Sequence, residues 1–227
     1  MPLILPSAIT WLYFFQAASS SAGWQLAIFN TVKIVQFGLP LVWVLAVQRN
    51  RLTVRPQHAR GVGLGLTFGA LVALAMFALY IAGLRDSSML NAAKDSIVGK
   101  VIGWGIDSPG KYAALGVFYS VVHSMLEEYY WRWFVFGQLR RIASLKLAIA
   151  LSSLGFMAHH VLVLGKFFGF DNPATWALSG CVAIGGAAWA WLYEHSGSLL
   201  GPWLSHLVVD AAIFLIGFDI VRFHLTG

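Results

Sequence analysis

The sequence is poor in cysteine and in charged residues. Its single cysteine, Cys181, lies in an apolar segment, so neither a disulfide framework nor a cysteine-based metal site is available. Charged residues make up 11% of the chain and hydrophobic residues 59%, whereas a soluble domain carries about 25% charged residues. The composition therefore indicates a polytopic membrane protein rather than a soluble protein with a large core.

Acidic residues are fewer than basic ones, which gives a net charge of +6. Such a balance can indicate nucleic-acid binding, but the basic residues flank apolar runs, so membrane topology explains them better and no nucleic-acid partner is expected. Two basic loops, at residues 49–60 and 140–146, predict a common cytoplasmic side in the cytoplasmic membrane. No basic segment precedes Lys33, so no secretory signal peptide is expected.

Long apolar runs predict an all-α fold, a transmembrane bundle of about seven helices that forms one integral-membrane domain over residues 1–227. Two helices are expected within residues 7–48, and a polar connection at 85–110 separates the next span from the others. The remaining spans are predicted at 61–84, 111–137, 147–164, 174–193 and 199–218. Gly61, Gly65 and Gly69 recur every four residues, which predicts close helix packing on one face.

Two common protease motifs are missing, the zinc motif H-E-x-x-H and the serine elbow G-x-S-x-G. Instead, Glu127, Glu128 and Arg132 stand alone in an apolar run. A charged side chain at the centre of a membrane helix costs roughly 2.5–3.5 kcal/mol on insertion scales. Glu128 and Arg132 are four residues apart and can pair. Glu127 is left without a local partner and is therefore the candidate for chemistry.

Other ionisable residues at membrane depth occur on three of the predicted helices. They are His123, the neighbours His159 and His160, and the pair His206 and Asp210, which share one helical face. A lone histidine in a membrane helix is more often a packing residue, and His123 is interpreted in this way. His159 and His160 are about 100° apart on a helix, so only one can point at a given site. The set as a whole predicts a polar site inside the bundle.

A carboxylate and a neutral imidazole can together deprotonate a water molecule, while a second imidazole stabilises an oxyanion. This combination fits hydrolysis of a peptide bond without a cofactor. Alternatively, zinc held by histidines and carboxylates can supply the nucleophile. A third interpretation, from another functional class, is a non-catalytic protein or a proton- or ion-coupled transporter that uses the same groups as a relay.

Three motifs in order, Glu127-Glu128-x-x-x-Arg132, Phe156-x-x-x-His160 and His206-x-x-x-Asp210, resemble those of the CPBP family of intramembrane proteases, the CAAX prenyl endopeptidase or Abi family. The resemblance covers residues 111–218, which would form the catalytic core. It implies a membrane endopeptidase that acts on a membrane-tethered peptide or protein.

Residue by residue, the resemblance implies that Glu127 is the general base and His160 its partner. Glu128 and Arg132 would form a structural ion pair, and His206 and Asp210 would line the oxyanion side. Many members carry asparagine where this chain has Asp210, and an ionised aspartate cannot donate a hydrogen bond to an oxyanion. It would then be protonated, orient His206 or bind a metal, in which case Glu127, His160, His206 and Asp210 are the expected ligands. The substrate, its prenylation and the oligomeric state are left open.

Overall fold

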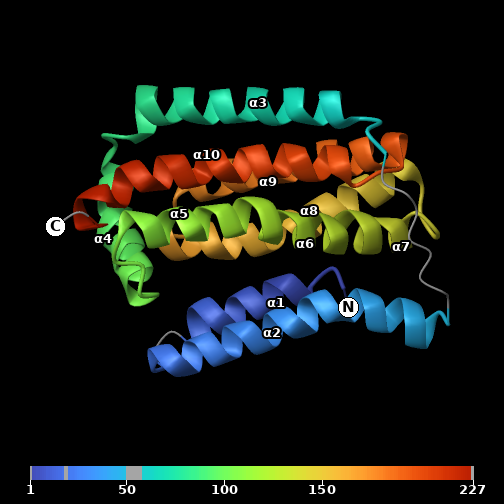
Figure 1. Cartoon of the computed structure of the whole chain (residues 1–227), viewed down its shortest axis with the longest axis horizontal. Coiled ribbons are helices and arrows are strands. Elements are labelled where there is room, and N and C mark those ends of the chain that lie inside the picture. The colour runs from blue at the N-terminus through green and yellow to red at the C-terminus, as the bar shows by residue number, and fades with distance from the viewer. Residues whose placement is uncertain (1, 18–19, 50–57, 226–227) are drawn as a thin grey trace.

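The computed structural model describes residues 2–17, 20–49 and 58–225 (Figure 1). Within these ranges the chain forms eight helices and no strand. Five of them are long and apolar enough to cross a membrane: Gly23–Val47, Val62–Leu84, Leu145–Phe168, Pro173–Ser196 and Leu200–Leu225. The predicted all-α membrane bundle of about seven helices is therefore confirmed.

The N-terminal part contains two helices, as the sequence predicts. α1 (Leu5–Trp11) continues in a π-helical turn to Gln16, and α2 (Ala22–Val42) continues in another to Val47. Ser21 caps α2 by accepting a hydrogen bond from the Trp24 N–H. Of the predicted basic loop at 49–60, Arg51 and Arg55 lie outside the described residues.

The helix that carries the acid pair runs without interruption from Pro109 to Leu139 and is not regular. α5 (Pro109–Val117), α6 (Ser124–Glu128) and α7 (Gly137–Leu139) alternate with π-helical segments at Phe118–His123 and Tyr129–Phe136. π-helical turns inside α-helices are rare and occur frequently at functional sites. The two carboxylates lie at the end of α6, directly before the second of these segments.

α3 (Val62–Leu79) packs along α10 (Leu200–Leu225) over most of its length. The two helices run parallel, because Gly65 meets the backbone of Gly201 and Gly69 meets Ser205. A Cβ atom on Gly69 would lie 2.8 Å from the Ser205 carbonyl oxygen. The recurring glycines thus allow the close packing that their spacing predicts.

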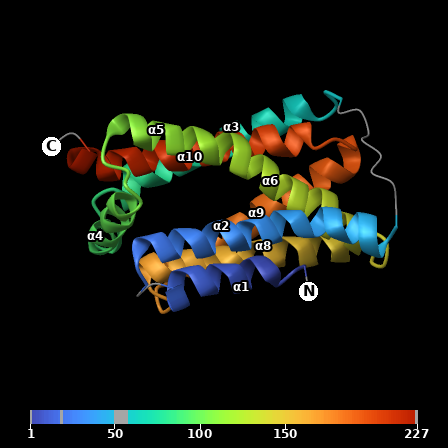
Figure 2. The same ribbon diagram turned by 60° about the horizontal axis from the view of Figure 1, so that its bottom comes forward.

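The remaining helices complete a layered bundle. α8 (Leu145–Phe168) packs against α9 (Pro173–Ser196), and α9 contacts α10. α1 lies on α8, so that α1 and α2 form one side of the molecule and α3 the opposite side (Figures 1 and 2). The connection at 85–110 contains a helix, α4 (Ser88–Gly103), which lies across one end of the bundle (Figure 1).

At the other end, two loops and the start of α3 come together. Arg140 pairs with Glu194 at 2.9 Å, and Gly61 packs against Ser196. The basic segment after α7, the turn before α10 and the start of α3 therefore share one end, as the topology prediction requires. The membrane face that this end meets stays a prediction.

Candidate active site

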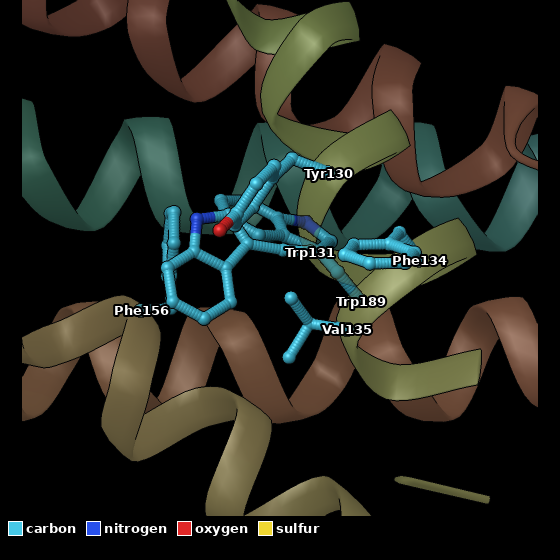
Figure 3. Close-up of a cluster of buried hydrophobic side chains, with 6 residues drawn as sticks. All are labelled: Tyr130, Trp131, Phe134, Val135, Phe156 and Trp189. Atoms are coloured by element: carbon cyan, nitrogen blue, oxygen red, sulfur yellow. The ribbon is translucent and has the colours of Figure 1, made fainter. Parts of the chain in front are cut away.

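The acid pair of α6 is buried, and its neighbour Arg132 lies against a hydrophobic cluster. Glu127 is 5% exposed, Glu128 is fully buried, and Arg132 is 2% exposed. The surrounding cluster consists of Tyr130, Trp131, Phe134, Val135, Phe156 and Trp189 (Figure 3). Four of these residues come from the same helical stretch as the acids, and the other two come from α8 and α9. Water is thus kept from most of the charged groups, which strengthens the electrostatic interactions among them.

Glu128 and Arg132 form the ion pair that their spacing predicts. Arg132 Nη1 lies 3.1 Å from Glu128 Oε1, and Arg132 Nη2 donates to the Gly186 carbonyl at 3.4 Å. The guanidinium also lies over the Phe156 and Trp189 rings, 4.7 and 5.0 Å from their centroids. Ion pairing and cation–π contacts together offset the burial of this arginine.

Glu128 has a second partner that the sequence did not suggest. Its Oε1 atom lies 2.8 Å from His206 Nδ1 on α10. The ring of His206 stacks on Trp189 at 4.2 Å between centroids, and the Trp189 indole donates to Ser205 Oγ. The orientation of this imidazole is therefore set by a carboxylate at one nitrogen and an aromatic ring on one face.

Each carboxylate oxygen of Glu127 lies near an imidazole nitrogen. His159 Nε2 is 3.6 Å from Glu127 Oε1, and His206 Nε2 is 3.7 Å from Glu127 Oε2. Both separations exceed a hydrogen-bond distance, as is often found for catalytic groups before substrate binds. The carboxylate that lacked a local partner in the sequence is thus flanked by histidines from α8 and α10.

His160 lies beside this pair rather than in it. No nitrogen of His160 is within 4 Å of a Glu127 oxygen. The centroids of the His160 and His159 rings are 4.1 Å apart. His160 Nδ1 lies 2.9 Å from the Phe156 carbonyl oxygen. A carbonyl only accepts, so Nδ1 carries the proton, and the neutral ring keeps a lone pair on Nε2. The structure therefore adds His159, which the motif comparison had set aside, to the contacts of Glu127.

Asp210 also approaches the site from α10. Its Oδ1 atom lies 3.6 Å from His206 Nε2, on the side of the ring opposite to Glu128. The carboxylate is 16% exposed, which is more than either glutamate. His206 is consequently surrounded by three carboxylates, those of Glu127, Glu128 and Asp210.

His123, which is interpreted from the sequence as a packing residue, lies outside these contacts, and so does Asp219 on α10. The His123 ring packs against Tyr119 and Phe37, with centroids 4.7 and 6.2 Å away. Asp219 accepts a hydrogen bond from Tyr80 at 2.8 Å and pairs with Arg85 at 3.1 Å.

Histidines and carboxylates, the side chains of this site, are also the ligand types of zinc sites. Among the residues that the structure describes, no group of three or more His, Cys, Asp or Glu side chains is arranged to hold a metal ion. The arrangement of these side chains therefore does not fit zinc.

Comparison with known proteins adds one finding. Residues 109–212 match the family model described as Rce1-like, type II CAAX prenyl endopeptidase. No curated protein and no solved structure matches the chain. The matched part contains the acid pair, Arg132, both α8 histidines, His206 and Asp210, and it is embedded in a bundle of membrane-spanning helices. The match of residues 109–212 to this family model confirms the resemblance to the CPBP family that is seen in the three motifs.

Proposed function

We propose that this protein is an intramembrane endopeptidase that hydrolyses a peptide bond with a water molecule activated by Glu127. The observation that supports this most directly is the placement of one buried carboxylate between imidazoles from two other helices, at 3.6 and 3.7 Å. The family match supports a protease, and the contacts of Glu127 support activation of the water by this carboxylate.

In the proposed reaction, Glu127 accepts a proton from water as the water oxygen bonds to the scissile carbonyl carbon. The carbonyl oxygen then carries the negative charge of the tetrahedral intermediate. When the carbon–nitrogen bond breaks, Glu127 returns the proton to the leaving amine, so the enzyme ends in its starting state. Such proton transfer contributes roughly 10²–10⁴-fold to a rate.

His160 is proposed to position the attacking water through Nε2. The contact of its Nδ1 with the Phe156 carbonyl leaves Nε2 as an acceptor for a water proton. His159 is proposed to hold the Glu127 carboxylate in place, because its Nε2 lies nearer to Glu127 than the nitrogens of His160 do and its ring stacks on Trp131. The two neighbours thus have different roles.

His206 is proposed to stabilise the oxyanion as an imidazolium. Its Nδ1 donates to Glu128, so a donor at Nε2 exists only when both nitrogens are protonated. The three carboxylates around the ring balance that positive charge. Of the three roles open to Asp210, its contact with Nε2 favours orientation of His206.

The proposed substrate is a membrane-tethered protein or peptide that is cleaved near its anchor or its C-terminus. A CAAX-type tail is one substrate of this kind. The proposed location is the cytoplasmic membrane, with lipid as the surrounding medium and without a nucleic-acid partner. The proposed reaction needs no cofactor.

The test is cleavage by purified protein in liposomes that contain a library of membrane-anchored peptides, read by mass spectrometry. Wild-type protein should release defined fragments, and Glu127→Gln should release none while remaining folded and inserted. A vesicle flux assay on the same two proteins tests the transporter alternative, which no contact among the described residues favours. Proton or ion flux that depends on Glu127, without cleavage, would overturn the proposal.

A further inference from the structure

Lys33 places a positive charge in the interior of a membrane-spanning helix. It lies about three helical turns after the start of α2 and about four before Val47. Lysines near helix ends reach the membrane surface with their long side chains. From this depth the ammonium cannot reach it, so Lys33 requires another explanation.

Few groups of the protein compensate this charge. The ammonium donates to Gln36 Oε1 at 3.4 Å and lies over the Phe29 and Phe37 rings, 5.7 and 5.4 Å from their centroids. Among the described residues, no carboxylate oxygen lies within 4 Å of it. An ammonium has three donors, and the protein therefore satisfies only part of its hydrogen-bonding capacity.

Lys33 lies on the side of α2 that faces the candidate active site. Phe37, one turn further along, contacts His123 and Tyr130, with centroids 6.2 and 6.4 Å apart. These two residues precede and follow Glu127 on its own helix. A helix outside the matched range of 109–212 thus presents a cation toward the site.

We propose that Lys33 binds the free C-terminal carboxylate of the peptide substrate, so that cleavage takes place close to that end. The proposal rests on the endopeptidase function proposed above and names its substrate class. A carboxylate suits the position because an anionic chain end inside the bilayer needs an opposite charge as much as the lysine does. A lipid phosphate is a poorer occupant, since headgroups lie at the surface, about three turns away from Lys33.

The experiment uses full-length protein in liposomes and two N-terminally anchored peptides that end in a carboxylate or a carboxamide. Wild-type protein should cleave the carboxylate form with a kcat/KM ~10–100-fold higher, the size expected for a charge-assisted hydrogen bond. Lys33→Met should remove this preference by raising KM for the carboxylate form alone, and Lys33→Arg should keep most of it. Lys166→Met is the matched control, because Lys166 is an exposed lysine over an aromatic ring, and it should keep the full preference.

Equal cleavage of both peptides by wild-type protein would overturn the role of Lys33 and leave the endopeptidase function intact. A loss in Lys33→Met that is the same for both peptides would also overturn it, since the lysine would then act on the catalytic groups or on folding. If Lys33→Met does not fold, the wild-type comparison and Lys33→Arg still decide the question. If neither of these peptides nor any peptide of the library is cleaved, the proposed function itself is contradicted.

Discussion

The Oε1 atom of Glu128 lies 2.8 Å from Nδ1 of His206 and so joins the first motif to the third. The same oxygen lies 3.1 Å from Arg132 Nη1. A residue that pairs within its own helix thus also fixes a histidine on another helix. Its neighbour Glu127 makes no contact as short as these with any residue that the structure describes.

This difference predicts opposite effects for the two glutamates. Glu128→Gln should destabilise the protein by about 3–5 kcal/mol, because Arg132 would keep a buried charge without its partner. Glu127→Gln should change stability far less and abolish cleavage. Unfolding of each variant in mixed micelles, followed by circular dichroism, measures the contrast. Equal destabilisation by both variants would assign Glu127 to structure.

The two neighbouring histidines should also differ. His160→Ala should lower kcat by at least ~10²-fold, the lower limit for loss of a group that assists proton transfer. His159→Phe keeps an aromatic ring beside Trp131 and removes both ring nitrogens, of which Nε2 is the one near Glu127, so a smaller loss is expected. Single-turnover cleavage compares them. A larger loss in His159→Phe would exchange the two proposed roles.

The role of Asp210 can be tested by replacing it with asparagine and with leucine. Asp210→Asn keeps an oxygen able to contact His206 Nε2 and adds an amide donor, so it should retain activity within ~10-fold. Asp210→Leu removes the oxygen and adds no donor, so kcat should fall by ~10²–10³-fold, as when an oxyanion-hole donor is removed. Both variants are assayed for kcat. Activity in the leucine variant would show that this carboxylate is dispensable.

A chelator separates the glutamic from the metal-dependent mechanism. Cleavage by purified protein should persist after dialysis against a strong chelator, and metal analysis should find less than one zinc per chain. This expectation follows from the arrangement of the side chains, because no group of His, Cys, Asp and Glu among the described residues forms a metal-binding site. Loss of activity that added zinc restores would favour the metal mechanism instead.

Helix packing offers a test that does not depend on catalysis. Gly65→Ala should destabilise the protein because its Cβ would overlap the Gly201 backbone. Gly63 lies on the same helix, and a Cβ atom added there would have nothing within 4 Å, so Gly63→Ala should be neutral or stabilising by up to about 1 kcal/mol. Thermal unfolding of the two variants is the comparison. Similar shifts would mean that α3 does not rest closely on α10.

Much of the fold and part of the site follow from the sequence. The apolar runs give the spans, because few alternatives exist for a chain segment in lipid. The approach of His206 to Glu127 follows similarly, since ionisable groups at that depth turn toward one another. Helical spacing also predicts the pairing of Glu128 with Arg132.

Other contacts depend on how the helices dock. His159 and His160 point in directions about 100° apart, so the sequence predicts that only one of them contacts Glu127. Which of the two histidines does so depends on how α8 docks against the catalytic helix, and this cannot be read from the spacing. The bond between Glu128 and His206 and the parallel course of α3 and α10 are likewise set by tertiary packing.

The widened turns of the catalytic helix have a consequence for how its length can vary in evolution. A π-helical turn bonds each residue to the fifth along and holds an extra residue compared with an α-turn. Removal of one residue after Arg132 in the stretch Tyr129–Phe136 would restore α-geometry and leave the two flanking halves in nearly the same rotation, because the π-turn accommodates the extra residue locally. The same deletion in a regular α-helical part, such as α5, would rotate the two sides of the helix by about 100° relative to each other. A one-residue deletion after Arg132 is therefore expected to disturb the site less than one in α5.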